Sequence, residues 1–282
     1  MIPTYNHGQF VQDAIDSILK SNFVDPEIIV VNDGSPDNTA QLIANDPRIE
    51  YYEQSNQGAH AAINFGLGKA SNDIVAILND DDLYHPNHLI EAILTLQSCN
   101  ADIFLGRAEP FGGGPLLEAM REHIRLCDER IAKYGLFETL TQLNFAVSTS
   151  AFVMKKDIYL GGKGFIGLTM CHDFEFLFSS IMNQDASIYY SSSPSWKYRA
   201  HGSNTSGTIT AQESAAQWYY ALFSNLVNAP EELEIAIERY SSNIGLNKSN
   251  ILAISTIINE YQKQPNMLAC IEQIKAYVTD AE

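Results

Sequence analysis

The first hundred residues alternate short apolar runs with segments in which apolar residues recur every three or four positions. The short runs indicate buried strands, whereas the longer period indicates amphipathic helices. Pro86 favours the start of a helix, where its missing N–H is tolerated. Repeated strand–helix units predict an α/β fold with a mostly parallel, doubly wound sheet flanked by helices. We expect strands at residues 1–3, 27–31, 49–52 and 74–78, and helices at 10–19, 37–44, 58–70 and from 86 onward.

The pattern becomes less regular after residue 100 and is only helical after residue 210. The first predicted strand is very short, so we expect the natural strand to extend upstream of Met1. We divide the chain into a domain at 1–210, with halves at 1–106 and 107–210, and a helical extension at 211–282. In the later part we expect strands at 101–106, at 145–154 and around Trp196, and helices at 116–134, 173–182, 215–227, 231–244, 251–261 and 267–278.

The composition narrows the possible function classes. The chain has 282 residues, is 45% hydrophobic and carries a formal net charge of -17. Such an acidic chain is a poor partner for nucleic acid, because phosphate contacts need clustered lysine and arginine. The four cysteines are far apart and indicate free thiols in a reducing compartment. No membrane span and no signal peptide is evident in the pattern, so we expect a cytoplasmic protein.

Three polar clusters follow predicted strands, at residues 4–6, 32–35 and 79–82. Parallel strands place their carboxyl ends at one edge of a sheet, where ligands bind in open α/β folds. The aspartates at 80–82 suit a hard divalent cation, which prefers oxygen ligands. The alternative is that one aspartate caps the next helix and the others are solvated. His7, His60 and His85 are expected to be surface histidines of loops or helices.

Four segments occur in one order: Pro3-Thr4-Tyr5-Asn6, "IIVVNDGS" at 28–35, Asn56-Gln57-Gly58, and "ILNDDDLYHP" at 77–86. Together they resemble the family 2 glycosyltransferases, which have the GT-A fold. The resemblance implies an inverting enzyme that uses Mn²⁺ or Mg²⁺ and moves a sugar from a nucleotide-diphosphate donor to a hydroxyl acceptor, and it favours a UDP-sugar as the donor. Residues 1–106 would bind the nucleotide-sugar and residues 107–210 the acceptor.

Later segments agree with the same family as far as residue 206. Gly161-Gly162 resembles its glycine pair, His172-Asp173 stands where it carries an acidic pair, and "YRAHGSN" at 198–204 resembles its Tyr-Arg-x-His segment. The resemblance implies that Asp173 is the general base and that Asp81 and His201 hold or adjoin the metal. The residues that it implies for nucleotide-sugar binding are Pro3, Thr4, Tyr5, Asp33, Asp80 and Arg199. Asp33 would accept a hydrogen bond from the base, and Arg199 would lie near the diphosphate or the metal.

Three positions depart from the family pattern. Asn79 replaces the first aspartate of Asp-x-Asp, Ile63 stands where many members carry an arginine, and His172 replaces the glutamate before the base. These departures favour an altered donor choice. They also leave open a non-catalytic nucleotide-sugar-binding or scaffold module with the same fold. A nucleotidyltransferase would show a glycine-rich, basic first loop, and "TYNHGQ" at residues 4–9 is not one.

The processive polysaccharide synthases of this family carry membrane spans and a Gln-x-x-Arg-Trp motif, and the chain shows neither. We therefore expect transfer of single sugars in surface polysaccharide or glycoconjugate biosynthesis. The acceptor would be a saccharide or a lipid-linked molecule. The extension at 211–282 could contact the inner face of a membrane or form a homodimer, and the sequence leaves both open.

Overall fold

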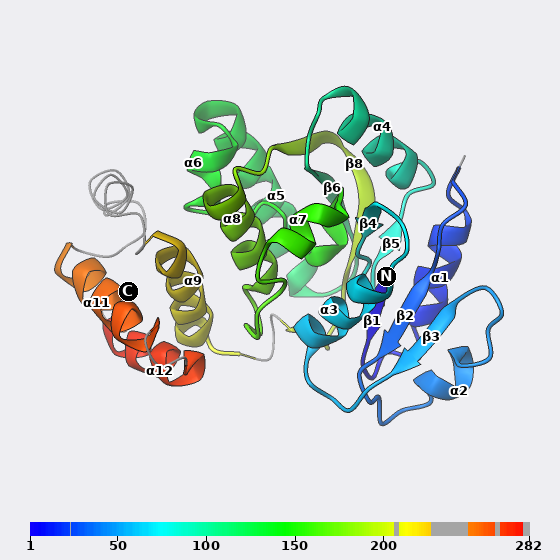
Figure 1. The fold of residues 1–282 in the computed structure, drawn as a ribbon, viewed down its shortest axis with the longest axis horizontal. Coiled ribbons are helices and arrows are strands. Elements are labelled where there is room, and N and C mark those ends of the chain that lie inside the picture. Colours follow the sequence, from blue (N-terminus) through cyan, green and yellow to red (C-terminus); the bar gives the residue numbers. More distant parts are fainter. Residues whose placement is uncertain (23, 206–208, 227–247, 263–265, 279–282) are drawn as a thin grey trace.

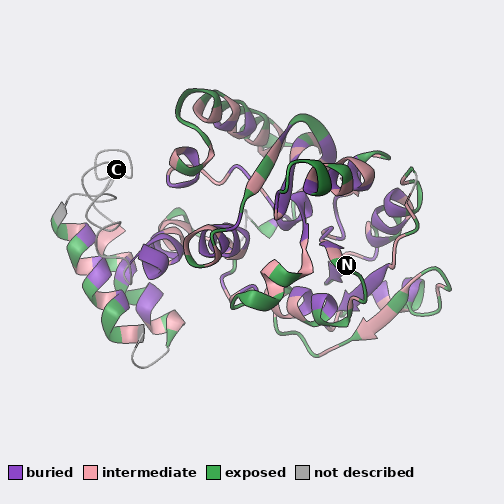
Figure 2. Cartoon of the chain, turned by 45° about the horizontal axis from the view of Figure 1, so that its top comes forward, coloured by how far each residue is buried: buried purple, intermediate pink, exposed green. Residues whose placement is uncertain are grey.

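The computed structural model describes residues 1–22, 24–205, 209–226, 248–262 and 266–278. Figure 1 shows central strands with helices on both sides, and the last three helices gathered at one end of the molecule. In Figure 2 the buried residues concentrate along the strands and on the inward sides of the helices. The predicted α/β class, with helices flanking a sheet and a helical C-terminal part, is confirmed.

The first hundred residues form the predicted strand–helix units. Helix α1 buries Val11, Ala14, Ile15 and Ile18 on one side, as its period predicts. Strands β1, β2 and β3 run parallel, in that order. The elements are β1 (Ile2–Thr4), α1 (Val11–Leu19), β2 (Ile29–Asn32), α2 (Thr39–Ile43), β3 (Glu50–Glu53), α3 (Ala59–Lys69), β4 (Ile74–Ala76), β5 (Leu83–Tyr84) and α4 (His88–Ser98).

A second sheet has the order β4-β7-β6-β8-β5. Its β6 and β8 run parallel, and its other neighbours run antiparallel. The two sheets meet at Met1, whose amino group donates to the carbonyl of Ala76 at 2.7 Å and whose carbonyl accepts from the amide of Leu78 at 3.1 Å. The remaining elements up to residue 200 are β6 (Ile103–Gly112), α5 (Pro115–Tyr134), α6 (Leu136–Leu140), η1 (Thr149–Ala151), β7 (Phe152–Lys155), α7 (Lys156–Gly161), α8 (His172–Gln184) and β8 (Ile188–Ala200).

The strand expected at 145–154 is wrong in its first part, because β7 begins only at Phe152. Phe145 is buried and apolar, which gave the misleading signal. Just after it, the amide of Ser148 donates to the carbonyl of Ala146 at 2.7 Å, and Val147 between them has φ 68°. Such a three-residue turn reverses the chain too sharply for a strand. The turn leaves Val147 and Ser148 beside a cavity described below.

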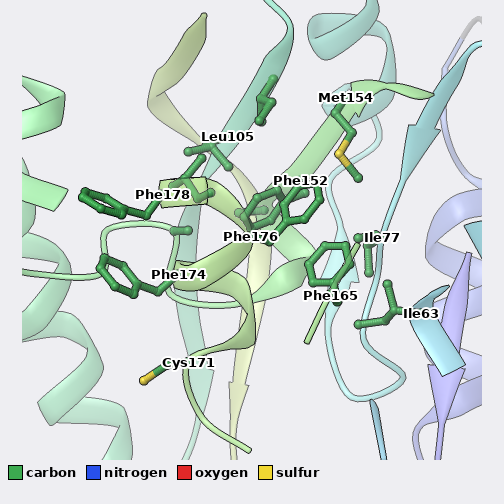
Figure 3. Packing of buried hydrophobic residues seen from close by; sticks show 14 of the residues in the cluster. Ile63, Ile77, Leu105, Phe152, Met154, Phe165, Cys171, Phe174, Phe176 and Phe178 are labelled. Carbon is green, nitrogen blue, oxygen red and sulfur yellow. The ribbon is translucent and has the colours of Figure 1, made fainter. Parts of the chain in front are cut away.

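Helix α8 lies in the core on more than one side. Figure 3 shows its Phe174, Phe176 and Phe178 among the packed side chains, with Phe152 and Phe165 nearby. Phe165 and Phe176 stack with ring centroids 4.2 Å apart. Full burial of an aromatic side chain contributes about 1.5–3 kcal/mol. Several such residues therefore hold the start of α8 in a fixed position. The polar residues His172 and Asp173 lie at that start.

The C-terminal helices α9 (Ala211–Leu226), α11 (Lys248–Gln262) and α12 (Met267–Val278) pack on α8 through α9. The indole of Trp218 stacks on Phe174 at 3.8 Å, and the side-chain oxygen of Gln217 accepts a 3.0 Å hydrogen bond from the amide of Met170. The helix expected at 231–244 lies outside the described residues. The boundary between 1–210 and 211–282 stays a prediction. None of the helices within the described ranges is both long and apolar enough to cross a membrane.

Candidate active site

The three polar clusters that follow β1, β2 and β4 meet as predicted, although β4 belongs to the second sheet and not to the sheet of β1 and β2. The amide of Tyr5 donates to Oδ2 of Asp80 at 3.2 Å, and the amide of Asn6 donates to Oγ of Ser35 at 3.0 Å. The amide of Asp33 donates to the carbonyl of Thr4 at 2.9 Å. Segments that are up to 75 residues apart in the chain therefore form one polar surface.

Two cavities open at this polar surface. The larger has a volume of about 630 Å³, and six of the predicted site residues line it: Pro3, Thr4, Tyr5, Asp33, Asp80 and Asp81. The smaller has a volume of about 250 Å³, and Asp173 lines it. The residues that line both cavities are Asn79, Asp81, Thr169, His172 and Thr205.

The side chain of Asp33 is hydrogen-bonded to the loop at residues 54–58. Its Oδ1 accepts hydrogen bonds from Nε2 of Gln54 at 2.8 Å and from the amide of Gln57 at 2.9 Å. Its Oδ2 accepts from the amide of Gly58 at 2.8 Å. Gly58 has φ 91°, a conformation that favours glycine. The carboxylate therefore shapes the wall of the larger cavity, and its predicted contact with a nucleotide base stays a prediction.

His7 lies in the loop after β1 and His60 on α3, as expected, and both also line the larger cavity, which was not predicted. Nδ1 of His7 lies 2.8 Å from Oδ1 of Asp80. Burial opposes a charge on His7, but the hydrogen bond to Asp80 and the surrounding carboxylates outweigh it and raise its pKa. Burial raises the pKa of Asp80, although His7 partly offsets this. His7 belongs to the polar stretch directly after β1, which was the signal that could have identified it.

Asp81 and His201 are in contact across 120 residues of sequence, with Nε2 of His201 2.9 Å from Oδ2 of Asp81. The amide of Ser203 donates to Nδ1 of His201 at 3.2 Å, so Nδ1 is an acceptor and Nε2 carries the ring proton, which it would have to lose to bind a metal. Together with His7, these residues offer one ligand atom each, all within 4.8 Å of one another. Two imidazoles and a carboxylate suit a metal that accepts both nitrogen and oxygen ligands.

Asp82 is turned away from this group and is buried. Its Oδ2 accepts from Oγ of Ser150 at 2.6 Å, and its Oδ1 accepts from the amide of Arg199 at 3.0 Å. Burial, together with the charge of Asp81, raises the pKa of Asp82 well above its usual range. Asp82 therefore links the segment at residues 79–82, here called the aspartate turn, to β8 and to residues 148–150.

Arg199 lines neither cavity. Its guanidinium carbon lies 4.7 Å from the ring centroids of both Phe10 and Phe111. Its Nε donates to the carbonyl of Asp81 at 2.8 Å, and a terminal nitrogen lies 3.1 Å from Oδ2 of Asp13. In this arrangement Arg199 supports the backbone of Asp81. The diphosphate contact expected for Arg199 stays a prediction.

Asn79 and Ile63, two of the residues that depart from the family pattern, have defined contacts in the structure. Asn79 uses both ends of its side-chain amide: Nδ2 donates to Oγ of Ser148 at 3.0 Å, and Oδ1 accepts from Oγ1 of Thr149 at 2.7 Å. It therefore joins the aspartate turn to the smaller cavity. Ile63 is fully buried on α3 and belongs to the hydrophobic core.

Asp173 lies in the first turn of α8 and is buried. Its Oδ2 accepts from Nδ2 of Asn144 at 2.8 Å, and its Oδ1 accepts from the amide of Phe174 at 2.8 Å. The carboxylate lies in the wall of the smaller cavity, whereas Asp81 borders both cavities. Asp81 thus lies at the junction between the cavities, and Asp173 lies beside it in the smaller one.

Neither cavity has a lysine or an arginine among its described lining residues. The ionisable side chains that line them are aspartates, histidines and tyrosines. An anionic ligand in the larger cavity would therefore need a bound cation or protonated histidines to balance its charge.

Comparison with known proteins identifies glycosyltransferases as relatives of this chain. The sequence model of glycosyl transferase family 2 matches residues 1–160, which is more than half of the chain. An uncharacterised glycosyltransferase of Rickettsia typhi is 27% identical over 248 residues, covering 86% of this chain and 75% of that protein. Glycosyltransferase GlyG of Streptococcus pneumoniae is 31% identical over 111 residues, covering 38% of this chain and 37% of GlyG.

Solved structures share the fold. S. aureus TarS in complex with UDP-GlcNAc superposes with a TM-score of 0.65 at 16% identity, covering 94% of this chain and 75% of the TarS chain. The mannosyltransferase PcManGT from Pyrobaculum calidifontis, in complex with GDP-Man and Mn²⁺, superposes with a TM-score of 0.58 at 15% identity, covering 99% and 84%. The predicted GT-A fold is confirmed.

Proposed function

The chain belongs to glycosyl transferase family 2, and we propose that it is an inverting, metal-dependent enzyme that moves a sugar from a UDP-sugar to a hydroxyl acceptor. The observation that carries this proposal is the pair of cavities that meet at Asp81 and His172. One cavity has all the predicted nucleotide-sugar-binding residues except Arg199, and the other has Asp173. A donor in the first and an acceptor in the second would bring the two reactants together at the junction.

The roles of the side chains follow from this placement. Asp173, held by Asn144, is positioned to take the proton of an acceptor hydroxyl, which makes the oxygen a better nucleophile. The hydroxyl would attack the sugar from the side opposite the diphosphate, and such direct displacement inverts the anomeric carbon. His7, Asp81 and His201 would hold a divalent cation, which when bound supplies Lewis acidity for the leaving diphosphate.

The donor cavity supports a metal requirement. Its described lining provides no lysine or arginine for the diphosphate. A UDP-sugar is favoured by the family resemblance and by the TarS complex with UDP-GlcNAc, although the PcManGT complex holds GDP-Man. The Mn²⁺ in the PcManGT complex supports Mn²⁺ as the cation.

We infer that the acceptor is uncharged near its attacking hydroxyl. Asp81 and Asp173 line the smaller cavity, and its described lining has no lysine or arginine. A phosphate or carboxylate next to the hydroxyl would be repelled there. Met120, Val147 and Met170 add apolar surface to the cavity, which suits the apolar face of a sugar ring. Surface polysaccharide or glycoconjugate synthesis at the cytoplasmic side of a membrane, and a homodimer, remain our expectations.

Calorimetry with UDP, with and without Mn²⁺, tests the donor site. We expect binding that needs Mn²⁺ and that is weaker with GDP. Slow hydrolysis of a UDP-sugar would then separate an enzyme from a non-catalytic binding module. Tight UDP binding without hydrolysis or transfer to any saccharide would favour the binding module. Absence of nucleotide binding would refute the proposed function.

A further inference from the structure

His172 borders both cavities. It is the first residue of α8 and lies in the wall of the larger cavity and of the smaller one. If the proposed function holds, the nucleotide lies in the first cavity and the acceptor in the second. The transferred sugar is bonded to the diphosphate and attacked by the acceptor, so it must lie where the cavities meet. His172 is therefore a neighbour of that sugar.

The hydrogen bond of His172 to the backbone determines which ring nitrogen can accept a further hydrogen bond. Nδ1 lies 3.0 Å from the carbonyl oxygen of Leu168. A carbonyl only accepts hydrogen bonds, so Nδ1 must carry a proton. In the neutral ring Nε2 is then an acceptor. The aromatic ring of Phe165 lies edge-on to the imidazole, with ring centroids 6.3 Å apart.

Of the other four residues that line both cavities, three are already engaged, and the fourth is the exposed Thr169. The amide of Asn79 is bonded to Ser148 and Thr149, and the carboxylate of Asp81 faces His201. Thr205 also has an interaction partner. A sugar hydroxyl at the junction is a donor that needs an acceptor, and Nε2 of His172 supplies one.

We propose that Nε2 of His172 accepts a hydrogen bond from a hydroxyl of the transferred sugar and thereby selects the donor sugar. The inference rests on the proposed function and adds a specificity-determining residue to it. A site that hydrogen-bonds a particular hydroxyl discriminates against sugars that lack it or hold it in another orientation.

Three histidines allow a matched experiment. His60 lines only the larger cavity, His123 only the smaller one, and His172 both. Dissociation constants would be measured by calorimetry with Mn²⁺ for UDP, UDP-glucose, UDP-galactose, UDP-GlcNAc and UDP-GalNAc. The variants are His172→Leu, His172→Gln, His60→Leu and His123→Leu, each with its melting temperature.

We expect the parent protein to bind one UDP-sugar more tightly than UDP. His172→Leu should lose that preference by about five- to tenfold, the size of one hydrogen bond, while its affinity for UDP stays within twofold. His172→Gln should recover part of the preference, because its side-chain oxygen can accept. His60→Leu should change UDP and UDP-sugar affinities by the same factor, and His123→Leu should change neither.

Several results would overturn the inference. His172→Leu and His172→Gln could leave the preference intact, or could weaken UDP and every UDP-sugar equally. A parent protein that binds UDP as tightly as all four UDP-sugars would refute the role of His172 and leave the nucleotide site standing. A parent protein that binds no UDP would refute the proposed function itself. These outcomes are distinguishable because UDP lacks the sugar.

Discussion

The side-chain amide of Asn144 donates a 2.8 Å hydrogen bond to Oδ2 of Asp173. Asn144 belongs to the turn before β7, and Asp173 to the first turn of α8. Nε2 of His123, on α5, lies 2.9 Å from the carbonyl oxygen of Asn144. Three separate segments therefore set the position of the carboxylate that faces the smaller cavity.

Replacement of Asp173 by asparagine tests its role as a base. Asparagine keeps the shape but cannot take a proton. We expect a near-normal melting temperature, UDP affinity within twofold of the parent protein and transfer reduced by at least ~100-fold. The measurement is the initial rate with a UDP-sugar and a saccharide acceptor.

Asn144→Leu is the matched variant, because it removes the donor to Asp173 and leaves the carboxylate in place. Its transfer rate should fall less than that of Asp173→Asn. If Asp173→Asn transfers sugar within a few-fold of the parent protein, Asp173 has only a structural role.

Replacement of Asp81 by asparagine tests the metal site. An amide is a weaker ligand than a carboxylate for a divalent cation, so we expect Mn²⁺-dependent UDP binding to be lost. The free energy of unfolding should change little, since Asp81 lies at a cavity wall. Calorimetry with UDP at several Mn²⁺ concentrations provides the measurement.

Asp16→Asn serves as the control for that experiment. Asp16 pairs with Arg48 on the surface, and its side chain is 46% exposed. This variant should bind UDP and Mn²⁺ like the parent protein. Retention of Mn²⁺-dependent binding by Asp81→Asn would remove Asp81 from the metal site.

Replacement of Arg199 by lysine distinguishes a structural role, support of the Asp81 backbone, from a contact with the diphosphate. Lysine loses the planar contact with Phe10 and Phe111 and the Nε bond to Asp81. From the support that Arg199 gives in the structure, we expect the free energy of unfolding to fall by about 1–3 kcal/mol. UDP affinity should stay within about threefold. Unchanged stability with a tenfold loss of UDP affinity, and no loss for uridine, would instead support the diphosphate contact that the resemblance implies.

Acid should destabilise the protein through His88. Its Nδ1 lies 3.0 Å from Oγ of Ser195, and its ring stacks on Tyr84 at 4.0 Å. Burial, with a smaller effect of His85, lowers the pKa of His88 to about 3. An unfolded histidine has a pKa of about 6.5, so the unfolded chain takes up this proton first as the pH falls. The stabilisation is complete above about pH 6.5 and is lost as the pH falls towards 3.

Between pH 7.5 and 5.0 this loss should be about 2 kcal/mol. His88→Gln can still hydrogen-bond to Ser195 but does not titrate, so its stability should fall less over the same interval. Urea unfolding of both proteins at the two pH values gives the comparison. An equal loss in the two proteins would show that the acid sensitivity arises elsewhere.

The missed or shortened elements have physical causes. Strand β8 was expected only near Trp196, because its serines at 191, 192, 193 and 195 interrupt the apolar pattern. Its extended form comes from pairing with β6 and β5, which no local pattern reveals. Likewise, the turn at Val147 depends on contacts with residues from other elements rather than on its own side chain.

The sequence by itself determined the strand–helix units of the first hundred residues and the polar clusters after their strands. Those features depend on local periodicity and on the rule that parallel strands end at one edge. Only the tertiary structure decided that His7 faces Asp80, that Asn144 holds Asp173 and that His172 borders two cavities. Such contacts join residues distant in the chain, and their energies depend on the positions of both partners, which a single sequence pattern does not contain.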